Sequence, residues 1–456
     1  MEYINRLKIN SLINWKSSTN RKPLILRGAR QVGKTTLVNF FSKSYTQFIS
    51  LNLEKKKDVQ LFKDYNEITT LVDAIFLYKN KDIKKIEHTL LFIDELQEST
   101  EAINLLRYFY EEFPSLHVIA AGSLLEHTLK ENSNLPVGRV QYLYVFPLNF
   151  KEFLFANNQQ MLLERLTTIP VDKVTHKQAL TWFHRYAIIG GMPEIVKTYV
   201  SEENISVLKS TYESIWATYK SDVEKYAKNK NEGKIIKHIM NVATSFLDER
   251  VTFKNFGKSN YKSREVSEAF RNLDEAKVIQ LIYPTTEVSP PIQTNFTKKP
   301  RLQFLDTGIV NYSMQIQAQL LKLEDLSDAY RGALIPHLVT QELISLEDIS
   351  YTKPNFWVRE KKQSSAEVDL VRVYENLLIP IEIKSGAKGR LKSLHQFIDQ
   401  ANHPFAIRIY GGSFSIESSK TRSGKDFYLM NVPYYLSTYL DDYIHYFIKN
   451  KQPITN

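Results

Sequence analysis

The chain has 456 residues with a net charge of +10 at neutral pH, and 43% of its residues are hydrophobic and 24% charged. These values are typical of a soluble globular protein with two or three domains, each large enough to have its own core. The absence of cysteine excludes disulfides, thiolate metal sites and cysteine nucleophiles, and the lack of a signal peptide and of an apolar run of roughly 18 residues leads us to expect a cytoplasmic protein without a membrane partner.

The first part of the chain contains a glycine-rich loop between an expected strand and an expected helix. An apolar run over residues 24–26 predicts a buried strand, and a helical pattern opens at Lys34. Between them, the sequence GARQVGKT at residues 28–35 has the G-x-x-x-x-G-K-T spacing of a phosphate-binding loop. The alternative is a chance glycine-rich turn, which both flanking elements disfavour.

Each part of this motif has a chemical role in phosphate binding. Glycines let the backbone N–H groups and the helix N-terminus face phosphate oxygens. Lys34 would reach the β and γ phosphates, and the Thr35 hydroxyl would bind Mg²⁺. The sequence therefore predicts a nucleotide-binding protein. The expected nucleotide-binding residues are Gly28, Ala29, Arg30, Gln31, Val32, Gly33, Lys34, Thr35 and Thr36.

An acidic pair ends a later apolar strand over residues 89–94. Asp94 could hold Mg²⁺ at the end of this strand, and Glu95, next to it, could polarise a water molecule. The alternative is an ordinary buried strand that ends in a solvated turn. The pair follows the phosphate loop by about 60 residues, a usual separation for such sites, so we expect an enzyme that binds and hydrolyses ATP with Mg²⁺.

The other expected elements of the first 155 residues are strands separated by helices. This alternation predicts a mostly parallel, doubly wound α/β sheet that binds its ligand at the carboxyl ends of the strands. The expected helices cover residues 3–16, 67–86 and 102–113, and the expected strands cover residues 48–53, 117–123 and 140–146.

Two polar residues near these strands are further candidates for catalysis. Ser123 ends the fourth strand and could hydrogen-bond the attacking water or the γ-phosphate, or it could simply cap the next helix. Arg139 precedes the fifth strand and could supply positive charge to the γ-phosphate, in its own subunit or in a neighbour of a homo-oligomer. The alternative for Arg139 is a solvated surface residue.

Five short motifs follow one another along the chain: RGARQVGKT (residues 27–35), FIDELQ (92–97), AGS (121–123), FPLNFKEF (146–153) and GGMPE (190–194). Together they resemble the AAA-type P-loop ATPases of prokaryotes that are fused to a poorly characterised C-terminal domain. The resemblance covers nearly the whole chain. It implies a sheet with strand order 5-1-4-3-2, Glu95 as the water-activating residue and Ser123 as a polar sensor. The physiological role of this family is largely unassigned.

The middle of the chain is rich in expected helices. Residues 155–230 form a helical segment in which the GGMP turn at residues 190–193 is a hinge or a tight packing point. Residues 233–300 contain short helices and a two-stranded segment around residues 277–282, an order that suits a winged helix. Its basic and aromatic residues allow DNA contact as one interpretation. The other is a protein-packing winged helix with a solvated charged face, which the charge density slightly favours. The basic and aromatic residues are Lys254, Lys258, Lys262, Arg264 and Arg271, with Phe253, Phe256 and Tyr261.

The last third of the chain carries a second chemical pattern. A strand over residues 367–371 is followed by a turn and a return strand over residues 378–385. Glu382 and Lys384 are two residues apart and project from one face of the return strand, and Asp369 could lie opposite them. Two carboxylates beside a lysine can bind Mg²⁺ and orient a hydroxide for attack on a phosphodiester.

The surrounding elements resemble the restriction-endonuclease-like fold, because a helix over residues 390–401 and a strand over residues 405–410 complete the order α-β-β-β-α-β. Nucleases of this fold usually have an acidic residue on the preceding helix. Here Pro336 or His337 holds that place, and Glu342 lies further along. A retained fold with a degenerate or purely binding site is therefore an alternative to an active nuclease.

Four segments follow from these patterns: an AAA-type core (1–155), a helical segment (156–230), a winged-helix-like segment (231–310) and a restriction-endonuclease-like domain (311–456).

The first functional hypothesis is an ATPase that acts on nucleic acid through its C-terminal half. The second is a nucleotide-gated regulatory or protein-interaction module whose nuclease-like domain is inactive. A nucleotide kinase is disfavoured, because no small substrate requires the long helical and winged-helix segments.

Overall fold

The computed structural model describes residues 4–122, 138–320, 332–349, 352–360, 366–384 and 391–450, which belong to two compact units. Unit 1 comprises Met1–Pro147, Glu275–Val278 and Glu347–Tyr351, and unit 2 comprises Leu148–Asp274, Ile279–Leu346 and Thr352–Asn456. The expected domain boundaries at about 155, 230 and 310 stay predictions. Among the described residues, no helix has the length and apolarity to cross a membrane.

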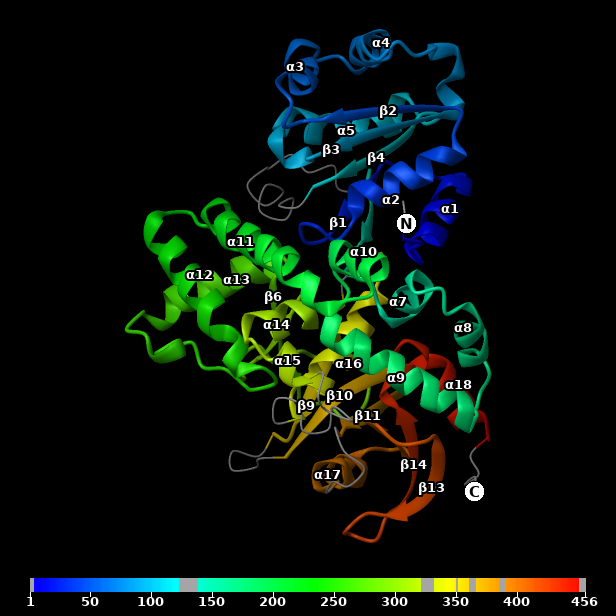
Figure 1. Ribbon diagram of the computed structural model, residues 1–456, viewed down its shortest axis with the longest axis vertical. Helices are drawn as coiled ribbons and strands as arrows, with labels where there is room; N and C mark the ends of the chain where they lie inside the picture. The colour runs from blue at the N-terminus through cyan, green and yellow to red at the C-terminus, as the bar shows by residue number, and fades with distance from the viewer. Residues whose placement is uncertain are drawn as a thin grey trace. The chain divides into compact units, whose positions relative to one another are not determined.

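Unit 1 is built on a sheet of five strands that all run parallel. Their order is β5-β1-β4-β3-β2, which is the order implied by the resemblance to AAA-type ATPases. The parallel α/β sheet predicted for this part of the chain is therefore confirmed (Figure 1). The strands are β1 (Leu24–Arg27), β2 (Gln47–Asn52), β3 (Thr89–Asp94), β4 (His117–Ala121) and β5 (Gln141–Tyr144).

Helices cover both faces of this sheet, so its strands are apolar throughout. Leu91 and Ile93 of β3 belong to a core that α3, α4 and α5 complete, whereas Leu90 and Phe92, which alternate with them, are buried on the opposite face. Figure 1 shows α3 and α4 on one side of the sheet and α1 and α2 on the other. The helices are α1 (Lys8–Ser17), α2 (Lys34–Phe41), α3 (Lys56–Asp64), α4 (Ile68–Tyr78) and α5 (Thr100–Glu112).

The helix expected over residues 67–86 is shorter in the structure, because α4 ends at Tyr78. Asn80 has a left-handed backbone with φ of 50°, and the Lys81 N–H donates to Phe76 O at 2.9 Å. This pattern is a common helix stop in which a residue with positive φ lets a later N–H satisfy a terminal carbonyl. A short 3₁₀ segment, Ile83–His88, then leads into β3.

A short segment from late in the sequence, residues 347–349, completes the edge of unit 1. The Tyr144 N–H of β5 donates to Asp348 O at 2.9 Å, and the Asp348 carboxylate accepts from Ser11 Oγ at 2.7 Å and pairs with the Lys8 ammonium. The Lys8 ammonium also donates to Glu347 O at 2.7 Å. Residues more than 200 positions apart therefore fix the edge beside β5 and α1. We call residues 347–349 the edge segment.

The first part of unit 2 is helical and contains a small antiparallel pair of strands. The GGMP turn lies between α9 and α10, as expected. The pair consists of β6 (Ile279–Ile282) and β8 (Arg301–Phe304). The helices are α7 (Phe150–Ala156), α8 (Gln160–Leu166), α9 (Lys173–Ile189), α10 (Pro193–Glu202), α11 (Leu208–Tyr226), α12 (Lys230–Val242), α13 (Ser263–Glu275), α14 (Thr307–Ser313), α15 (Gln317–Leu320) and α16 (Leu334–Ser345).

The GGMP turn is a tight packing point. A Cβ atom added to Gly191 would lie 2.0 Å from Leu148 O, and one added to Gly190 would lie 2.2 Å from Asp306 Oδ1. The Gly191 N–H donates to the buried Asp306 carboxylate at 2.5 Å. Glycine is therefore required here because backbone and carboxylate approach too closely for a side chain.

The second part of unit 2 is a mixed sheet of seven strands in the order β13-β14-β12-β11-β10-β9-β7. The helix α17 packs on one face, where Trp357 meets Phe397 in a core. The elements α16, β9, β10, β11, α17 and β12 follow one another in the predicted order, and the name of the fold stays a prediction. The bounds are β7 (Pro284–Thr285), β9 (Asn355–Val358), β10 (Glu367–Tyr374), β11 (Leu377–Ile383), α17 (Lys392–Gln400), β12 (Phe405–Tyr410), β13 (Ser415–Lys420), β14 (Asp426–Pro433) and α18 (Leu440–Asn450).

Candidate functional site

The glycine-rich loop joins β1 to α2 at the carboxyl edge of the parallel sheet. Gly28 has φ of 143°, and a Cβ atom there would lie 2.1 Å from Val145 O. Gly33 has φ of 92°, and Gln31 takes a left-handed conformation with φ of 60°. The side chains of Ala29 and Val32 are buried, so they anchor the loop while its backbone curves. Glycine is therefore suited to positions 28 and 33, because both have a positive φ and the Val145 backbone is too close to Gly28 for a side chain.

Lys34 is the first residue of α2, and its side chain folds back into the loop. Its ammonium donates to Gly28 O at 2.9 Å and to Ala29 O at 2.8 Å, and the residue is buried. Burial lowers the pKa of Lys34 to about 8, although the carboxylates of Glu95 and Asp94 act in the opposite direction. The lysine cation is therefore held in the loop beside two carboxylates.

The end of β3 brings a carboxylate to the start of α2. The Thr35 Oγ1 donates to Asp94 Oδ2 at 2.8 Å. Burial raises the pKa of Asp94, and the hydrogen bond from Thr35 opposes this shift. A hydroxyl and a carboxylate side by side are oxygen ligands of the kind that Mg²⁺ prefers.

Glu95 directly follows β3 and has a left-handed backbone with φ of 54°. Gln97 Nε2 donates to Glu95 Oε2 at 2.7 Å and so orients the carboxylate. A residue with a side chain rarely adopts this backbone conformation, and such outliers concentrate at functional sites. The motif FIDELQ contains Gln97, but its spacing alone did not predict this contact.

Arg6 supports the loop from the N-terminal side and was not predicted from the sequence. Its guanidinium donates to Val32 O at 2.8 Å and to Phe146 O at 2.5 Å, and the residue is 5% exposed. It therefore links the glycine-rich loop to the chain that follows β5. An arginine in an amphipathic N-terminal segment carries no motif, so no sequence signal could have identified this role.

Arg139 lies away from the loop in unit 1. It precedes β5, whose first residue, Gln141, is in register with Leu24 at the start of β1. Arg139 is therefore at the amino edge of the parallel strands, whereas the loop is at the carboxyl edge. Its Nε lies 2.8 Å from Glu111 Oε1, near the end of α5. The expectation that Arg139 reaches the γ-phosphate of its own subunit does not fit this geometry.

The other predicted catalytic residue near these strands, Ser123, lies outside the described residues.

The remaining loop residues differ in exposure. Arg30 lies 3.7 Å from Glu54 through its Nη2 atom. Gln31, Thr35 and Thr36 are exposed. Of the predicted nucleotide-site residues, the structure brings Lys34, Thr35, Asp94 and Glu95 together at one edge of the sheet.

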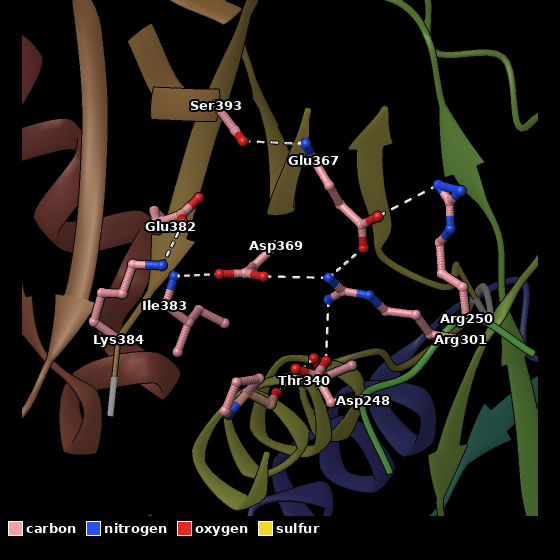
Figure 2. A network of polar contacts seen from close by, with 11 residues as sticks. Asp248, Arg250, Arg301, Thr340, Glu367, Asp369, Glu382, Ile383, Lys384 and Ser393 are labelled. Carbon is pink, nitrogen blue, oxygen red and sulfur yellow. Dashed lines mark hydrogen bonds and ion pairs between the residues drawn. The ribbon is translucent and has the colours of Figure 1, made fainter. Parts of the chain in front are cut away.

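A second cluster of charged residues lies on the seven-stranded sheet in unit 2. Lys384 Nζ lies 2.6 Å from Glu382 Oε1, and Asp369 Oδ2 accepts from the Ile383 N–H at 2.8 Å. The prediction that Asp369, Glu382 and Lys384 share one face is thus consistent with the contacts (Figure 2). Burial raises the pKa of Glu382 to about 7, and the neighbouring Asp369 carboxylate adds to the shift.

Four further residues join this cluster and were not predicted. Arg301 of β8 contacts three carboxylates: its Nη1 lies 3.1 Å from Asp248 Oδ1, and its Nη2 lies 3.3 Å from Asp369 Oδ1 and also contacts Glu367 Oε1. Arg250 Nη1 lies 3.3 Å from Glu367 Oε2. Figure 2 shows the Arg301 side chain extending between these carboxylates. Asp248 and Arg301 are distant in sequence from Glu382 and Lys384, so only the fold reveals that they belong to the same cluster.

The electrostatics of this cluster follow from its burial. Burial raises the pKa of Asp248 to about 7, and the Arg301 cation opposes this shift. Burial also disfavours the charge of Arg301, but Asp248, Asp369 and Glu367 outweigh it and raise the pKa of the guanidinium. Arg301 is therefore a permanent cation.

Glu342 does not belong to this cluster. Its carboxylate accepts from the Phe150 N–H at 3.0 Å, at the N-terminus of α7, and from Tyr186 Oη at 2.6 Å. The expectation that Glu342 supplies a nuclease-like ligand is therefore not supported by its position. His337 accepts from the Phe304 N–H at 3.0 Å through Nε2, and burial lowers its pKa to about 3, so it is a neutral, structural residue.

The basic residues of the middle segment are exposed, but its aromatic residues point mostly inward. Phe256 is buried and packs against Phe246 and Phe270. Stacking of nucleic-acid bases requires exposed rings, and the buried Phe256 does not offer one. The exposed basic residues are Lys254, Lys258, Lys262, Arg264 and Arg271.

Sequence families match three parts of the chain. Residues 20–154 match the family described as AAA domain. Residues 180–320 and 331–433 match two domains of unknown function, DUF8612 and DUF4143. The ATPase-type character of the first part is therefore supported, and the folds of the later parts stay unidentified. No curated protein matches the chain significantly.

Two solved structures resemble the chain at low sequence identity. A Walker-type ATPase of Pyrococcus abyssi aligns with a TM-score of 0.44 and 14% identity, over 68% of this chain and 96% of that chain. The RuvB Holliday junction branch migration motor of Thermotoga maritima aligns with a TM-score of 0.27 and 14% identity, over 64% of this chain and 93% of that chain.

Proposed function

We propose that unit 1 binds ATP with Mg²⁺ and hydrolyses it. The observation that carries this proposal is the juxtaposition of Lys34, the Thr35–Asp94 pair and Glu95 at the carboxyl edge of the parallel sheet. Ligands of such sheets bind at this edge. The match of residues 20–154 to the AAA domain supports the same assignment.

The role of each residue follows from its chemistry. The backbone N–H groups of residues 28–36 would hold the phosphates, and Lys34 would exchange its two loop carbonyls for phosphate oxygens. Thr35 and Asp94 would hold Mg²⁺, which neutralises charge on the phosphates. Glu95, oriented by Gln97, would polarise the attacking water.

Two substitutions test this proposal. Lys34→Ala should abolish ATP binding, because a cation and its charge-assisted hydrogen bonds to phosphate are lost. Glu95→Gln should bind ATP but not hydrolyse it, because an amide is too weak a base to polarise water. Binding is measured with a fluorescent ATP analogue and turnover by phosphate release.

Matched controls are available on the same unit. Lys43→Ala and Glu98→Gln remove the same charges from exposed positions, and both should bind and hydrolyse ATP like the parent. Parental turnover in both Lys34→Ala and Glu95→Gln would show that the site assignment is wrong.

We further propose that nucleic acid regulates this activity through the exposed basic residues between positions 254 and 271 of unit 2. The five exposed basic residues and the inward packing of Phe256 favour contact with the phosphate backbone rather than with bases. ATP turnover with and without DNA or RNA tests the idea. Stimulation that falls steeply with salt is expected, whereas equal turnover in all conditions would favour a protein-interaction module.

A further inference from the structure

The charged cluster on β10 and β11 depends on one central cation. This cation is the Arg301 guanidinium, which contacts Asp248 and two carboxylates of β10, Glu367 and Asp369. The Arg301 side chain is 14% exposed, so these contacts are largely shielded from water. Electrostatic interactions in such an environment are stronger than on an open surface.

Arg301 brings the charges of the cluster closer to balance, because with it three cations face four carboxylates. Without Arg301, only two cations would face these four carboxylates, and an uncompensated buried charge is strongly unfavourable. The carboxylates are Asp248, Glu367, Asp369 and Glu382, and the other cations are Arg250 and Lys384.

The geometry suits a guanidinium and not a metal ion. The carboxylate oxygens are distributed around the planar fork of Arg301, which presents several N–H donors. A divalent cation instead needs its oxygen ligands at about 2.0–2.6 Å from one point. Among the residues that the structure describes, no group of three or more acidic or histidine side chains is close enough together to hold a metal.

One buried oxygen beside the cluster has unused capacity as a ligand. Glu382 is 6% exposed, and its Oε1 contacts Lys384. Its Oε2 is buried and has no hydrogen-bond partner within the described part of the chain. A buried carboxylate oxygen without a donor is costly, and the neighbouring Asp369 carboxylate adds negative charge beside it, so a cation bound next to both groups would be favourable.

We propose that Arg301 is the built-in cation of this site, in the place of a divalent metal ion, and that the site takes up such an ion only when the guanidinium is withdrawn. The ligands for the ion would be carboxylate oxygens, including those of Asp369 and Glu382, which suits Mg²⁺ or Mn²⁺. The proposal concerns unit 2 alone and is independent of ATP hydrolysis by unit 1.

The experiment counts Mn²⁺ ions bound to the nucleotide-free full chain, by the electron paramagnetic resonance signal of free Mn²⁺. Arg301→Gln removes the charge and keeps hydrogen-bonding groups, and it should bind one additional ion per chain. Arg301→Lys keeps the positive charge and should bind no more than the parent. Arg301→Gln combined with Glu382→Gln should lose the additional ion.

An arginine of the seven-stranded sheet, to which β10 and β11 of the cluster also belong, provides a matched control. Arg408 of β12 is also partly buried, at 18% exposure of its side chain, and hydrogen-bonds Asn431. Arg408→Gln should bind the same number of ions as the parent. Circular dichroism and thermal unfolding report whether each variant is folded.

Three results would overturn the proposal. The first is a folded Arg301→Gln variant that binds no more Mn²⁺ than the parent. The second is an Arg301→Lys variant that gains the ion as readily as Arg301→Gln. The third is that the parent itself binds a Mn²⁺ ion and that the single substitution Glu382→Gln abolishes this binding. If Arg301→Gln folds only with Mn²⁺, the proposal is supported, and if it folds in neither condition, the proposal fails.

Discussion

Lys34 is a cation whose surroundings disfavour its charge. Because burial lowers its pKa to about 8, an increasing share of the side chain is neutral above this pH. Only the ammonium form attracts phosphate, so the Kd for ATP should rise about tenfold between pH 7.5 and pH 9. Lys34→Arg keeps its charge in this range and should show a flat profile, whatever its affinity. A parent Kd that is independent of pH up to 9 would contradict this expectation.

Arg139 forms an exposed ion pair with Glu111 at the amino edge of the strands. We therefore expect Arg139→Ala to leave ATP binding intact and to change turnover by no more than about twofold, since exposed ion pairs contribute little. Phosphate release by dilute and by concentrated protein checks this expectation. A loss of about 10³-fold confined to concentrated protein would instead show that Arg139 acts on a neighbouring subunit.

Residues whose chemistry is contained in a short motif could be predicted from the sequence. Lys34, Thr35 and Asp94 lie where the spacing of their motifs placed them, because a strand, a tight loop and a helix fix their positions locally. Arg6 and Arg301 could not be predicted, because each acts on backbone or carboxylates far away in sequence. Only the tertiary fold brings such partners together.

At the level of elements, the parallel strands of unit 1 were predicted well, since apolar runs bounded by turns define them. Helix ends were predicted less well. The helix expected to reach residue 86 ends at Tyr78, because Asn80 adopts a positive φ that no periodicity reveals. The sequence left open whether Glu342 reaches the charged cluster, and its carboxylate instead contacts the Phe150 N–H and Tyr186. All residues of its helix are buried, so the sequence does not show which side chain faces which neighbour.

The GGMP turn between α9 and α10 tolerates no side chain at its second glycine. Gly191→Ala would bring a Cβ atom to 2.0 Å from Leu148 O, so backbone must move and the hydrogen bond to Asp306 weakens. We expect this substitution to lower the free energy of unfolding by about 2–4 kcal/mol. Chemical denaturation of the full chain, followed by circular dichroism, provides the measurement.

Gly233 provides the matched control within α12. A Cβ atom there would lie 3.6 Å from the Ala227 Cβ, an ordinary contact. Because alanine favours helix over glycine, Gly233→Ala should raise stability by about 0.5–1 kcal/mol. Equal effects of the two substitutions would show that close approach at the turn is not the cause.

The whole molecule consists of two compact units, each with its own sheet. We expect thermal unfolding to show two transitions, of which one belongs to unit 1. A non-hydrolysable ATP analogue with Mg²⁺ at 100 times its Kd should stabilise that transition by about 2.7 kcal/mol and leave the other unchanged. Calorimetry of the parent and of Lys34→Ala makes the comparison, and the variant should show no shift. A single transition that moves as a whole would mean that the units unfold together.

The edge segment has a consequence for how the gene can be divided. The nucleotide-binding motifs lie within the first 155 residues, yet Asp348, which binds β5 and pairs with Lys8, is encoded almost 200 codons later. A recombinant fragment that ends near residue 155 would therefore expose an unpaired strand edge and two polar side chains that had lost their partner. The ATPase portion cannot be exchanged between genes as a cassette, because a replacement for the C-terminal half must also supply an aspartate at the position that closes this edge.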